Sequence, residues 1–153
     1  MKTAIICKSI HHDNTLRVAQ VMAEELQAEI FTPEDFKSDS LENYDLVGFG
    51  SGIYMGKHHR TLVNLVKELD ALSGKDVFVF YTSGFVKFPT QPPFETKLLK
   101  QLTLRGANVK DVFSCRGWET WGPFRIGGGK NKGHPDDTDF ENARVFARAL
   151  IRV

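Results

Sequence analysis

Cysteine is scarce in this chain of 153 residues: only Cys7 and Cys115 occur, far apart and both in apolar runs. A disulfide framework is therefore not expected. No apolar stretch approaches the roughly 20 residues that a membrane helix needs, and the first residues turn polar too quickly for a signal peptide. The 20 Lys and Arg are balanced by 19 Asp and Glu, so the basic excess of a typical nucleic-acid-binding protein is missing. We expect a cytoplasmic protein with no membrane span and no nucleic-acid partner, at its simplest a monomer.

The composition supports a well-filled core. Hydrophobic residues make up 41% of the chain, and 12 residues are Phe. The length is typical of one domain, so we assign residues 1–153 to a single domain. Apolar runs rich in β-branched and aromatic residues recur at 3–7, 29–32, 46–50, 77–82 and 109–115. Several are apolar at consecutive positions, which predicts strands covered on both faces, as in a parallel sheet.

The segments between these runs have helical periodicity. One apolar stripe comprises Leu16, Ala19, Ala23 and Leu26; others cover residues 62–72 and 94–102, and the latter ends at Gly106, a natural helix terminator. Residues 33–44 are acidic and weakly periodic, which predicts a short or irregular helix. Thr138 and Glu141 fit a capping box at the start of a last helix. Strand and helix thus alternate, and the fold class is a doubly wound α/β three-layer sandwich with right-handed crossovers.

Ligands of open α/β sheets bind beyond the carboxyl ends of the strands, so the segments after each strand are the candidate site. Residues 8–15 follow the first strand and combine hydroxyl, amide and imidazole groups with the start of a helix. Exposed N–H groups and the helix dipole make such a place suited to a phosphate. The alternative is that Ser9, Asn14 and Thr15 only cap the helix.

Several phosphate chemistries lack their motifs here. Neither the G-x-G-x-x-G dinucleotide fingerprint nor the G-x-x-x-x-G-K-[ST] P-loop is present. Cys7 ends the first strand, where a phosphatase nucleophile would stand, but the Arg that such a cradle needs is replaced by Asp13. A receiver domain would need acidic residues at the ends of the first and third strands, and none is there. The loop is suited to holding a phosphate rather than transferring one.

Three segments carry a resemblance to a known family. Residues 9–15 (SIHHDNT) resemble the S/T-x-T-G-N-T loop by which flavodoxins bind the phosphate of FMN, most closely at Asn14 and Thr15. Residues 50–56 (GSGIYMG) resemble the second flavodoxin loop, and residues 42–45 (ENYD) also recur in that family. His11 and His12 depart from the pattern, and Asp13 replaces its Gly. The resemblance covers the chain in element order and implies a five-stranded parallel sheet of order 2-1-3-4-5 with FMN, rather than FAD or a nicotinamide dinucleotide, as the cofactor.

The flavin ring needs aromatic or thioether packing on its faces and backbone groups at its pyrimidine edge. Tyr54 is the prime candidate for stacking, with Met55 beside it, and Phe85 would cover the other face or the edge. The predicted cofactor-binding residues are Ser9, Ile10, His11, His12, Asn14, Thr15, Ser51, Gly52, Ile53, Tyr54, Met55, Gly56, Thr82, Ser83, Gly84 and Phe85. We assign no catalytic and no metal-binding residue. His11, His12, His58 and His59 are conceivable metal ligands, but adjacent histidines rarely aim at one metal.

The function implied by the resemblance is that of an FMN-binding flavoprotein in electron transport, most simply a low-potential one-electron carrier that meets a reductase and an acceptor protein. One alternative is an FMN-dependent oxidoreductase acting on a small molecule or on a porphyrin or quinone, because residues 42–45 and 56–59 also resemble the flavodoxin-type protoporphyrinogen oxidase. A further alternative is a binding domain without redox chemistry. Residues 116–137 contain two Trp, six Gly and two Pro, and we expect this long segment to form a lid on the core or a surface for a partner or substrate.

Overall fold

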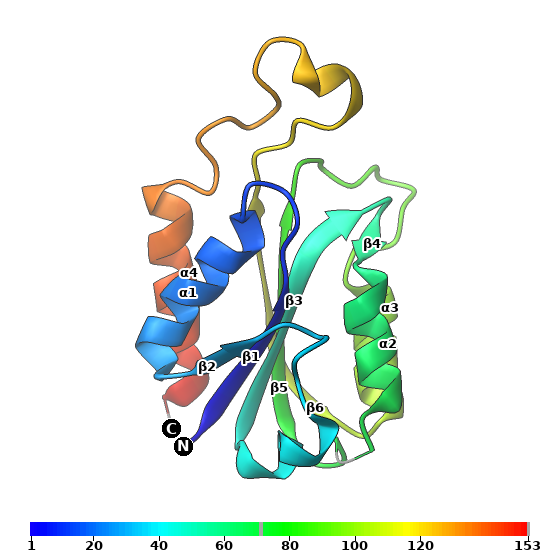
Figure 1. The fold of residues 1–153 in the computed structure, drawn as a ribbon, viewed down its shortest axis with the longest axis vertical. Coiled ribbons are helices and arrows are strands. Elements are labelled where there is room, and N and C mark those ends of the chain that lie inside the picture. Colours follow the sequence, from blue (N-terminus) through cyan, green and yellow to red (C-terminus); the bar gives the residue numbers. More distant parts are fainter. Residues whose placement is uncertain (71, 153) are drawn as a thin grey trace.

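The computed structural model describes residues 1–70 and 72–152, which form a β-sheet with helices on both faces (Figure 1). The strands are β1 (Thr3–Lys8), β2 (Glu29–Phe31), β3 (Leu46–Tyr54), β4 (Lys57–His58), β5 (Asp76–Ser83) and β6 (Asn108–Arg116). The α-helices are α1 (Asn14–Leu26), α2 (Arg60–Glu68), α3 (Thr96–Leu104) and α4 (Asp137–Ile151), and two short 3-10 helices are η1 (Ser38–Asn43) and η2 (Gly122–Arg125).

The strand order is β2-β1-β3-β5-β6, and all these neighbours are parallel. Ile6 of β1, for example, lies between Phe31 of β2 and Phe49 of β3. This confirms the predicted order 2-1-3-4-5. The short β4 accounts for the shift in numbering: it pairs antiparallel with the end of β3, and a strand of two residues leaves too little pattern to be predicted.

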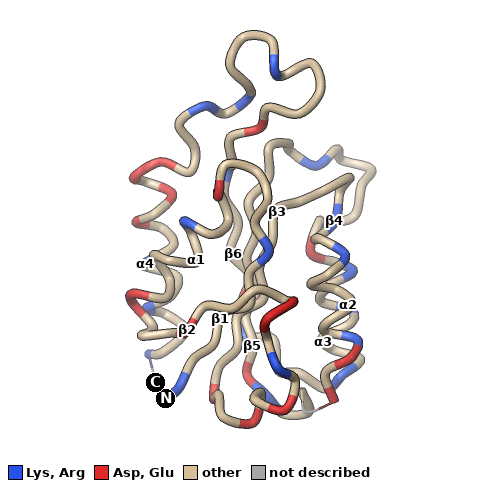
Figure 2. The backbone as a smooth tube through the Cα atoms, in the orientation of Figure 1, with Lys and Arg blue, Asp and Glu red and all other residues tan. Residues whose placement is uncertain are grey.

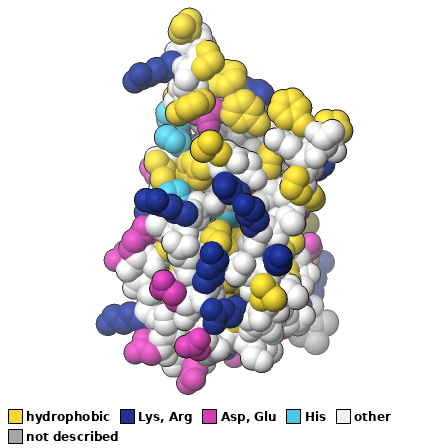
Figure 3. All heavy atoms as spheres, turned by 90° about the vertical axis from the view of Figure 1, so that its right-hand side faces the viewer, with side chains coloured by type: hydrophobic (Ala, Val, Ile, Leu, Met, Phe, Trp, Pro, Cys, Tyr) yellow, Lys and Arg dark blue, Asp and Glu magenta, His cyan; other side chains and the backbone are white. Residues whose placement is uncertain are grey.

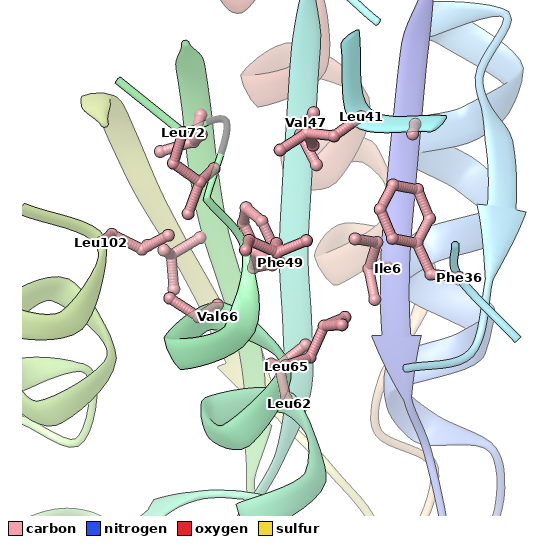
Figure 4. Packing of buried hydrophobic residues seen from close by; sticks show 14 of the residues in the cluster. Ile6, Phe36, Leu41, Val47, Phe49, Leu62, Leu65, Val66, Leu72 and Leu102 are labelled. Atoms are coloured by element: carbon pink, nitrogen blue, oxygen red, sulfur yellow. The ribbon is translucent and has the colours of Figure 1, made fainter. Parts of the chain in front are cut away.

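The two faces of the sheet bury separate apolar clusters, because successive side chains of a strand point to opposite faces. Ile5 and Cys7 pack with α1 and α4, whereas Ala4 and Ile6 pack on the side of α2 and α3. Figure 4 shows the second cluster, in which leucines and Val66 from the α2 side meet Phe49 of β3. Within the described chain, none of the helices combines the length and the apolar content that a membrane span requires.

Two of the three glycines of strand β3 make room for large rings from β5. Phe78 stands opposite Gly48 and Phe80 opposite Gly50 in the register. A Cβ at either glycine would overlap the ring beside it. The two Phe side chains are fully buried and fill the space between β3 and α1, so the small residues permit the large ones.

Helix α1 begins where expected, but its buried stripe differs from the prediction. Val18 and Met22 are fully buried, whereas Leu16, which we assigned to the stripe, is only partly covered. The stripe begins at Thr15 and passes through Val18 and Met22 to Leu26. Because Thr15, the first residue of this buried stripe, is polar, the spacing of the apolar residues alone did not reveal the stripe.

The predicted cap of the last helix was wrong by two residues. Asp136 is the N-cap of α4 and forms a capping box with Asp139: each side chain accepts from the other residue's backbone N–H, at 2.9 Å in both directions. Thr138 is exposed and lies inside the first turn. The backbone N–H of Asp139 holds the pKa of Asp136 below its usual range. Two overlapping boxes are possible in this sequence, and the earlier one, with aspartates at both positions, is used.

Candidate functional site

Polar and aromatic residues gather at the carboxyl ends of β1, β3 and β5, at the top of Figure 1. The loop from β1 to α1, the end of β3 and the loop after β5 border one pocket there. Its lining consists of Ser9, Ile10, His11, Asn14, Thr15, Gly52, Ile53, Tyr54, Thr82, Gly84, Gly117, Trp118 and Glu119. With residues 117–119 after β6, four segments that are distant in the sequence thus form one site.

The β1–α1 loop enters its helix through two residues in the left-handed conformation, His12 with φ 52° and Asp13 with φ 51°. The resembling family pattern has Gly at the second position, and Asp is among the few other residues that tolerate this conformation. Asp13 is exposed, and its side chain makes no capping bond to α1. Lys8 pairs with Glu34 at 2.6 Å rather than with Asp13. The amino end of α1 therefore keeps free N–H groups beside the pocket.

Asn14 and Thr15, the first residues of α1, are both buried. The Thr15 hydroxyl lies 2.8 Å from that of Thr82, so the β1–α1 loop is bonded to the end of β5. Since only one hydroxyl of such a pair donates to the other, the second O–H remains free for another acceptor. Asn14 Nδ2 donates to the Trp118 carbonyl at 2.9 Å, while Asn14 Oδ1 is buried without a partner. An unpaired buried polar atom is costly, and here it lies at the pocket.

The end of β3 turns back into β4 through Met55 and Gly56, with φ of 51° and 78°. Two left-handed residues are what a type I′ hairpin requires. Met55 has an unfavourable conformation for an unbranched apolar residue, and its side chain is 97% exposed. Backbone strain of this kind persists where the surrounding structure fixes it.

Ser51 and His58 fix the hairpin from beneath. The Ser51 hydroxyl donates to the Gly52 carbonyl at 2.7 Å and accepts from the His59 backbone N–H at 3.0 Å. Because its single proton is used, His58 Nδ1, 3.0 Å away, acts as the donor. His58 Nε2 is then a bare lone pair, buried and without a partner. Burial lowers the pKa of His58 to about 3, so the ring is neutral at physiological pH.

Tyr54 lies between the β1–α1 loop and the hairpin. Its ring meets His59 edge-on at 5.3 Å and lies 6.0 Å from the ring of His11. The hydroxyl folds back over Gly52, where a Cβ would be only 2.8 Å from it. Burial raises the pKa of Tyr54 to about 12, so the phenol stays protonated and uncharged.

A second, largely apolar pocket of about 560 Å³ continues from Tyr54 toward the loop after β5. That volume is typical of sites for cofactors and other small ligands. Its lining comprises Ile53, Tyr54, Met55 and Gly56 of the hairpin, His11 of the β1–α1 loop, Ser83, Phe85, Val86, Phe88, Gln91 and Phe94 from the end of β5 and the segment after it, and Glu119 and Trp121 of the strap. Most of these side chains are apolar or aromatic, which suits a flat, apolar ligand.

The connection from β6 to α4, residues 117–136, which we call the strap, borders the first pocket through Gly117, Trp118 and Glu119, and the rest of it projects beyond the carboxyl edge of the sheet (Figure 1). Trp118 stacks on His12 with ring centroids 3.9 Å apart, and His12 Nε2 lies 2.8 Å from the Thr120 hydroxyl. Glu119 pairs with Lys130 through backbone hydrogen bonds and so closes the strap on itself. The sequence predicts that this segment forms a lid on the core or a surface for a partner or substrate, but it places none of these residues in the site, because the aromatic and glycine residues there follow no regular period.

The structure brings nearly all the predicted site residues to these two pockets. His12 and Ser51 are the exceptions: His12 supports Trp118 from outside, and Ser51 lies fully buried beneath the hairpin. Of the weighed metal ligands, His11, His58 and His59 border one groove, but the only His, Cys, Asp or Glu cluster of metal-binding spacing among the described residues is His134, Asp136 and Asp139. Burial raises the pKa of Cys7 to about 12, which leaves an inert thiol at the end of β1.

A parallel sheet of this order with a polar loop, an aromatic hairpin and an apolar pocket at its carboxyl edge defines a doubly wound ligand-binding protein. The flavodoxin domain family matches residues 5–118, and the chain belongs to that family. An uncharacterized protein of Methanocaldococcus jannaschii is 39% identical over 152 residues, which is 99% of both chains. The structure is similar to flavodoxin 2 of Bacillus cereus, with a TM-score of 0.73, 21% identity and coverage of 98% and 97% of the two chains. It is also similar to a flavodoxin from the domain Archaea, with a TM-score of 0.67, 15% identity and coverage of 98% and 96%. Flavodoxins bind FMN and transfer electrons to redox partners.

Proposed function

We propose that this protein binds FMN at the carboxyl edge of the sheet and works as a low-potential one-electron carrier between protein partners. The observation that carries the proposal is the convergence of the β1–α1 loop, the β3–β4 hairpin and the loop after β5 on two adjoining pockets. One pocket is lined by hydrogen-bonding groups and the other by apolar ones, as a phosphate and an isoalloxazine ring require.

The residues of the first pocket fit a phosphate. The amino end of α1 supplies N–H groups and the positive end of the helix dipole. Asn14 and Thr15 add side-chain donors: Asn14 Nδ2 uses one of its two protons on the Trp118 carbonyl, and the Thr15 hydroxyl is paired with that of Thr82, which leaves one O–H of that pair free. The pocket itself is narrow, with room for little more than one water molecule, about 20 Å³. A phosphate therefore requires the strap beside it to move outward.

The residues of the second pocket fit the ring. Tyr54 and Met55 would cover one face of a flat ring and Phe85 the other, so both faces would be shielded from water. The backbone at Thr82 and Gly84 borders the adjoining pocket and would serve the polar pyrimidine edge. When bound, FMN supplies reversible electron transfer; the protein binds it, orients it and excludes water from its faces.

A low potential is supported by the surroundings of the ring. Apolar walls and an aromatic face disfavour the negative charge that accompanies reduction. Lys57 and Arg60 act in the opposite direction, but both are exposed, and water and salt screen charges in such positions.

The test is reconstitution of the purified chain with FMN, followed by stepwise reduction and reoxidation recorded by absorbance. We expect a stable yellow protein that is reduced and reoxidised reversibly by one-electron reagents without a substrate of its own. Turnover of a small molecule without a second protein would instead identify an oxidoreductase. A chain that never becomes yellow would identify a binding domain without redox chemistry.

Asn14 and Thr15 test the phosphate assignment within this proposal. Because charge-assisted hydrogen bonds contribute roughly 1.5–3 kcal/mol each, replacing both with Ala should weaken FMN binding by a few kcal/mol. The free energy of unfolding of the FMN-free chain should fall by roughly 0.5–1.5 kcal/mol for each lost bond, to the Trp118 carbonyl and to Thr82, so FMN binding is compared under conditions in which both chains are fully folded. A double variant that still purifies with a full complement of FMN would contradict the assignment.

A further inference from the structure

A basic groove runs along the α2 side of the hairpin, next to the proposed ring pocket. It has a volume of about 550 Å³ and contains Lys57 of β4, Arg60 and Lys67 of α2, and Lys97 of α3. Within the described chain, its lining includes no carboxylate. Figure 2 shows Lys and Arg segments beside β4 and along α2 and α3.

These cations are not neutralised by the protein itself. Among the described residues, none of the four lies within salt-bridge distance of an Asp or Glu side chain. The opposite face differs: Glu25 on α1 holds Arg148 of α4 through two hydrogen bonds of 2.8 and 2.9 Å, and Arg144 joins them. A chain with a net charge of only +1 therefore concentrates uncompensated positive charge on one side.

The groove is continuous with an exposed apolar rim. The two share His11, Tyr54 and Met55 in their linings. The rim consists of Met55, Phe85, Val86, Phe88 and Trp121, whose exposed fractions range from 43% to 97%. Figure 3 shows hydrophobic side chains gathered at this end of the molecule, with Lys and Arg directly below them. Glu119, which lines the apolar pocket beside the rim, accepts a hydrogen bond from the Trp121 backbone N–H at 2.6 Å.

Exposed large apolar side chains around a redox site, bordered by unpaired charge of one sign, match the anatomy of a protein interface: an apolar centre with a polar periphery. Short-lived redox complexes bury little surface, under about 1,200 Å², and charge complementarity governs how fast they form. A second copy of this chain is a poor occupant, because it would present the same positive charge. A partner of opposite charge fits.

We infer that the basic groove and the apolar rim together form the docking surface for an acidic redox protein, which presents Asp and Glu side chains around its own redox centre. This inference rests on the proposed function, since it assumes that electrons leave and enter at the ring pocket. The acidic carboxylates contact the groove, and the rim brings the two redox centres together.

The experiment uses the FMN-loaded protein in its oxidised form and a reduced, acidic [2Fe–2S] ferredoxin as probe. One electron passes from the iron–sulfur centre, which is oxidised, to the bound flavin, and stopped-flow absorbance gives the rate. We expect the rate to fall as ionic strength rises from about 0.01 M to about 0.15 M, because the Debye length shortens from about 30 Å to about 8 Å. As a control of opposite charge, the reduced protein donates an electron to a basic c-type cytochrome. We expect that rate to rise with ionic strength or to stay level.

Two matched double variants test which part of the surface carries the charge that governs the rate. Arg60→Glu with Lys97→Glu cancels the positive charge of the groove, because Lys57 and Lys67 remain; both changed positions lie in the first turn of a helix, where Glu is favoured, so folding should be retained. Lys37→Glu with Arg152→Glu makes the same change in net charge near η1 and the C-terminus, at the other end of the molecule (Figure 1). At low salt the groove variant should lose at least about tenfold in rate with the ferredoxin, and the control less than about twofold.

The outcomes separate this inference from the proposed function. Equal losses in both variants, or a ferredoxin rate that rises with salt, would overturn the docking surface while leaving an electron carrier. Sedimentation shows whether the chain dimerises. If the groove affects the rate only when the chain is a dimer, the surface binds a second copy, and the docking surface for an acidic partner is overturned as well. A chain that takes up no FMN, or whose bound flavin exchanges electrons with neither probe, would overturn the proposed function and this inference with it.

Discussion

Tyr54 is the residue on which the ring pocket depends most directly. If its ring covers the flavin, Tyr54→Ala should weaken FMN binding by roughly 0.5–1.5 kcal/mol, the range of an aromatic contact beyond its buried area. The same change should make the reduction potential less negative, because an electron-rich face near the flavin opposes added negative charge. Titration of FMN and a redox titration followed by absorbance measure both effects.

Tyr54→Phe is the control, since it keeps the face and loses only a hydroxyl that is protonated throughout the physiological range. It should change affinity and potential only slightly. Unchanged values in Tyr54→Ala would refute the stacking role and transfer it to Phe85 or Trp118, leaving the hairpin with backbone contacts alone.

His58 should make the stability of the protein depend on pH. Its folded-state pKa of about 3 lies below the unfolded value of about 6.5, so the unfolded chain binds more protons between these values. The free energy of unfolding should therefore fall as pH decreases from about 6.5 toward 3, with His58 contributing up to about 1.4 kcal/mol per pH unit. Above about pH 6.5 this contribution should be constant.

The measurement is urea unfolding across that pH range for the parent and for His58→Asn, which retains a side-chain N–H donor near the Ser51 hydroxyl but does not titrate. Carboxylates affect both proteins alike, so the difference between the two pH profiles reports His58. Parallel profiles would show that the ring is not buried in the neutral form.

At the scale of elements, we expect the strap to control access to the proposed phosphate pocket, because Trp118 is part of its lining. Trp118 is held from three directions: its indole Nε1 donates to Gly128 O at 2.9 Å, its ring stacks on His12, and its carbonyl accepts from Asn14. Since the pocket beneath is narrow, Trp118→Ala should speed both association and dissociation of FMN severalfold, with a smaller change in the dissociation constant. Stopped-flow quenching of flavin fluorescence measures both rates.

Ile126→Ala on the same strap is the matched control, because Ile126 is 88% exposed and lies outside both pockets. Its rates should equal those of the parent. If Trp118→Ala also leaves them unchanged, FMN enters by another route and the strap is only a structural connection.

Element positions could be predicted from the sequence to the extent that local pattern determines them. The consecutive apolar residues at 77–82 identify a strand covered on both faces, and β5 is found there. The phase of α1 and the cap of α4 were misjudged, because Thr15 begins a buried stripe with a polar residue and two capping boxes overlap near Asp136. Strand β4 has only two residues, and its pairing depends on the turn at Met55 and Gly56 rather than on a periodic signal.

At the scale of the whole molecule, the sheet order and the place of the site followed from the alternation of strands and helices together with the flavodoxin-like loops. The closure of the strap over Asn14 was beyond that reasoning, because it joins residues about one hundred positions apart through a Gly-rich segment without periodicity. The charge asymmetry was equally hidden. A net charge of +1 gives no indication that Arg60 and Lys97 come together unpaired beside the ring pocket.

The most direct test of the account is a pair of calorimetric titrations of the FMN-free chain, one with FMN and one with riboflavin. The two ligands share the ring and differ in the phosphate, so the comparison isolates the pocket at the amino end of α1. With at least two charge-assisted hydrogen bonds to the phosphate, we predict that FMN binds about a hundredfold more tightly or better. Equal affinities would contradict the account, because the loop from Ser9 to Thr15 would then hold no phosphate.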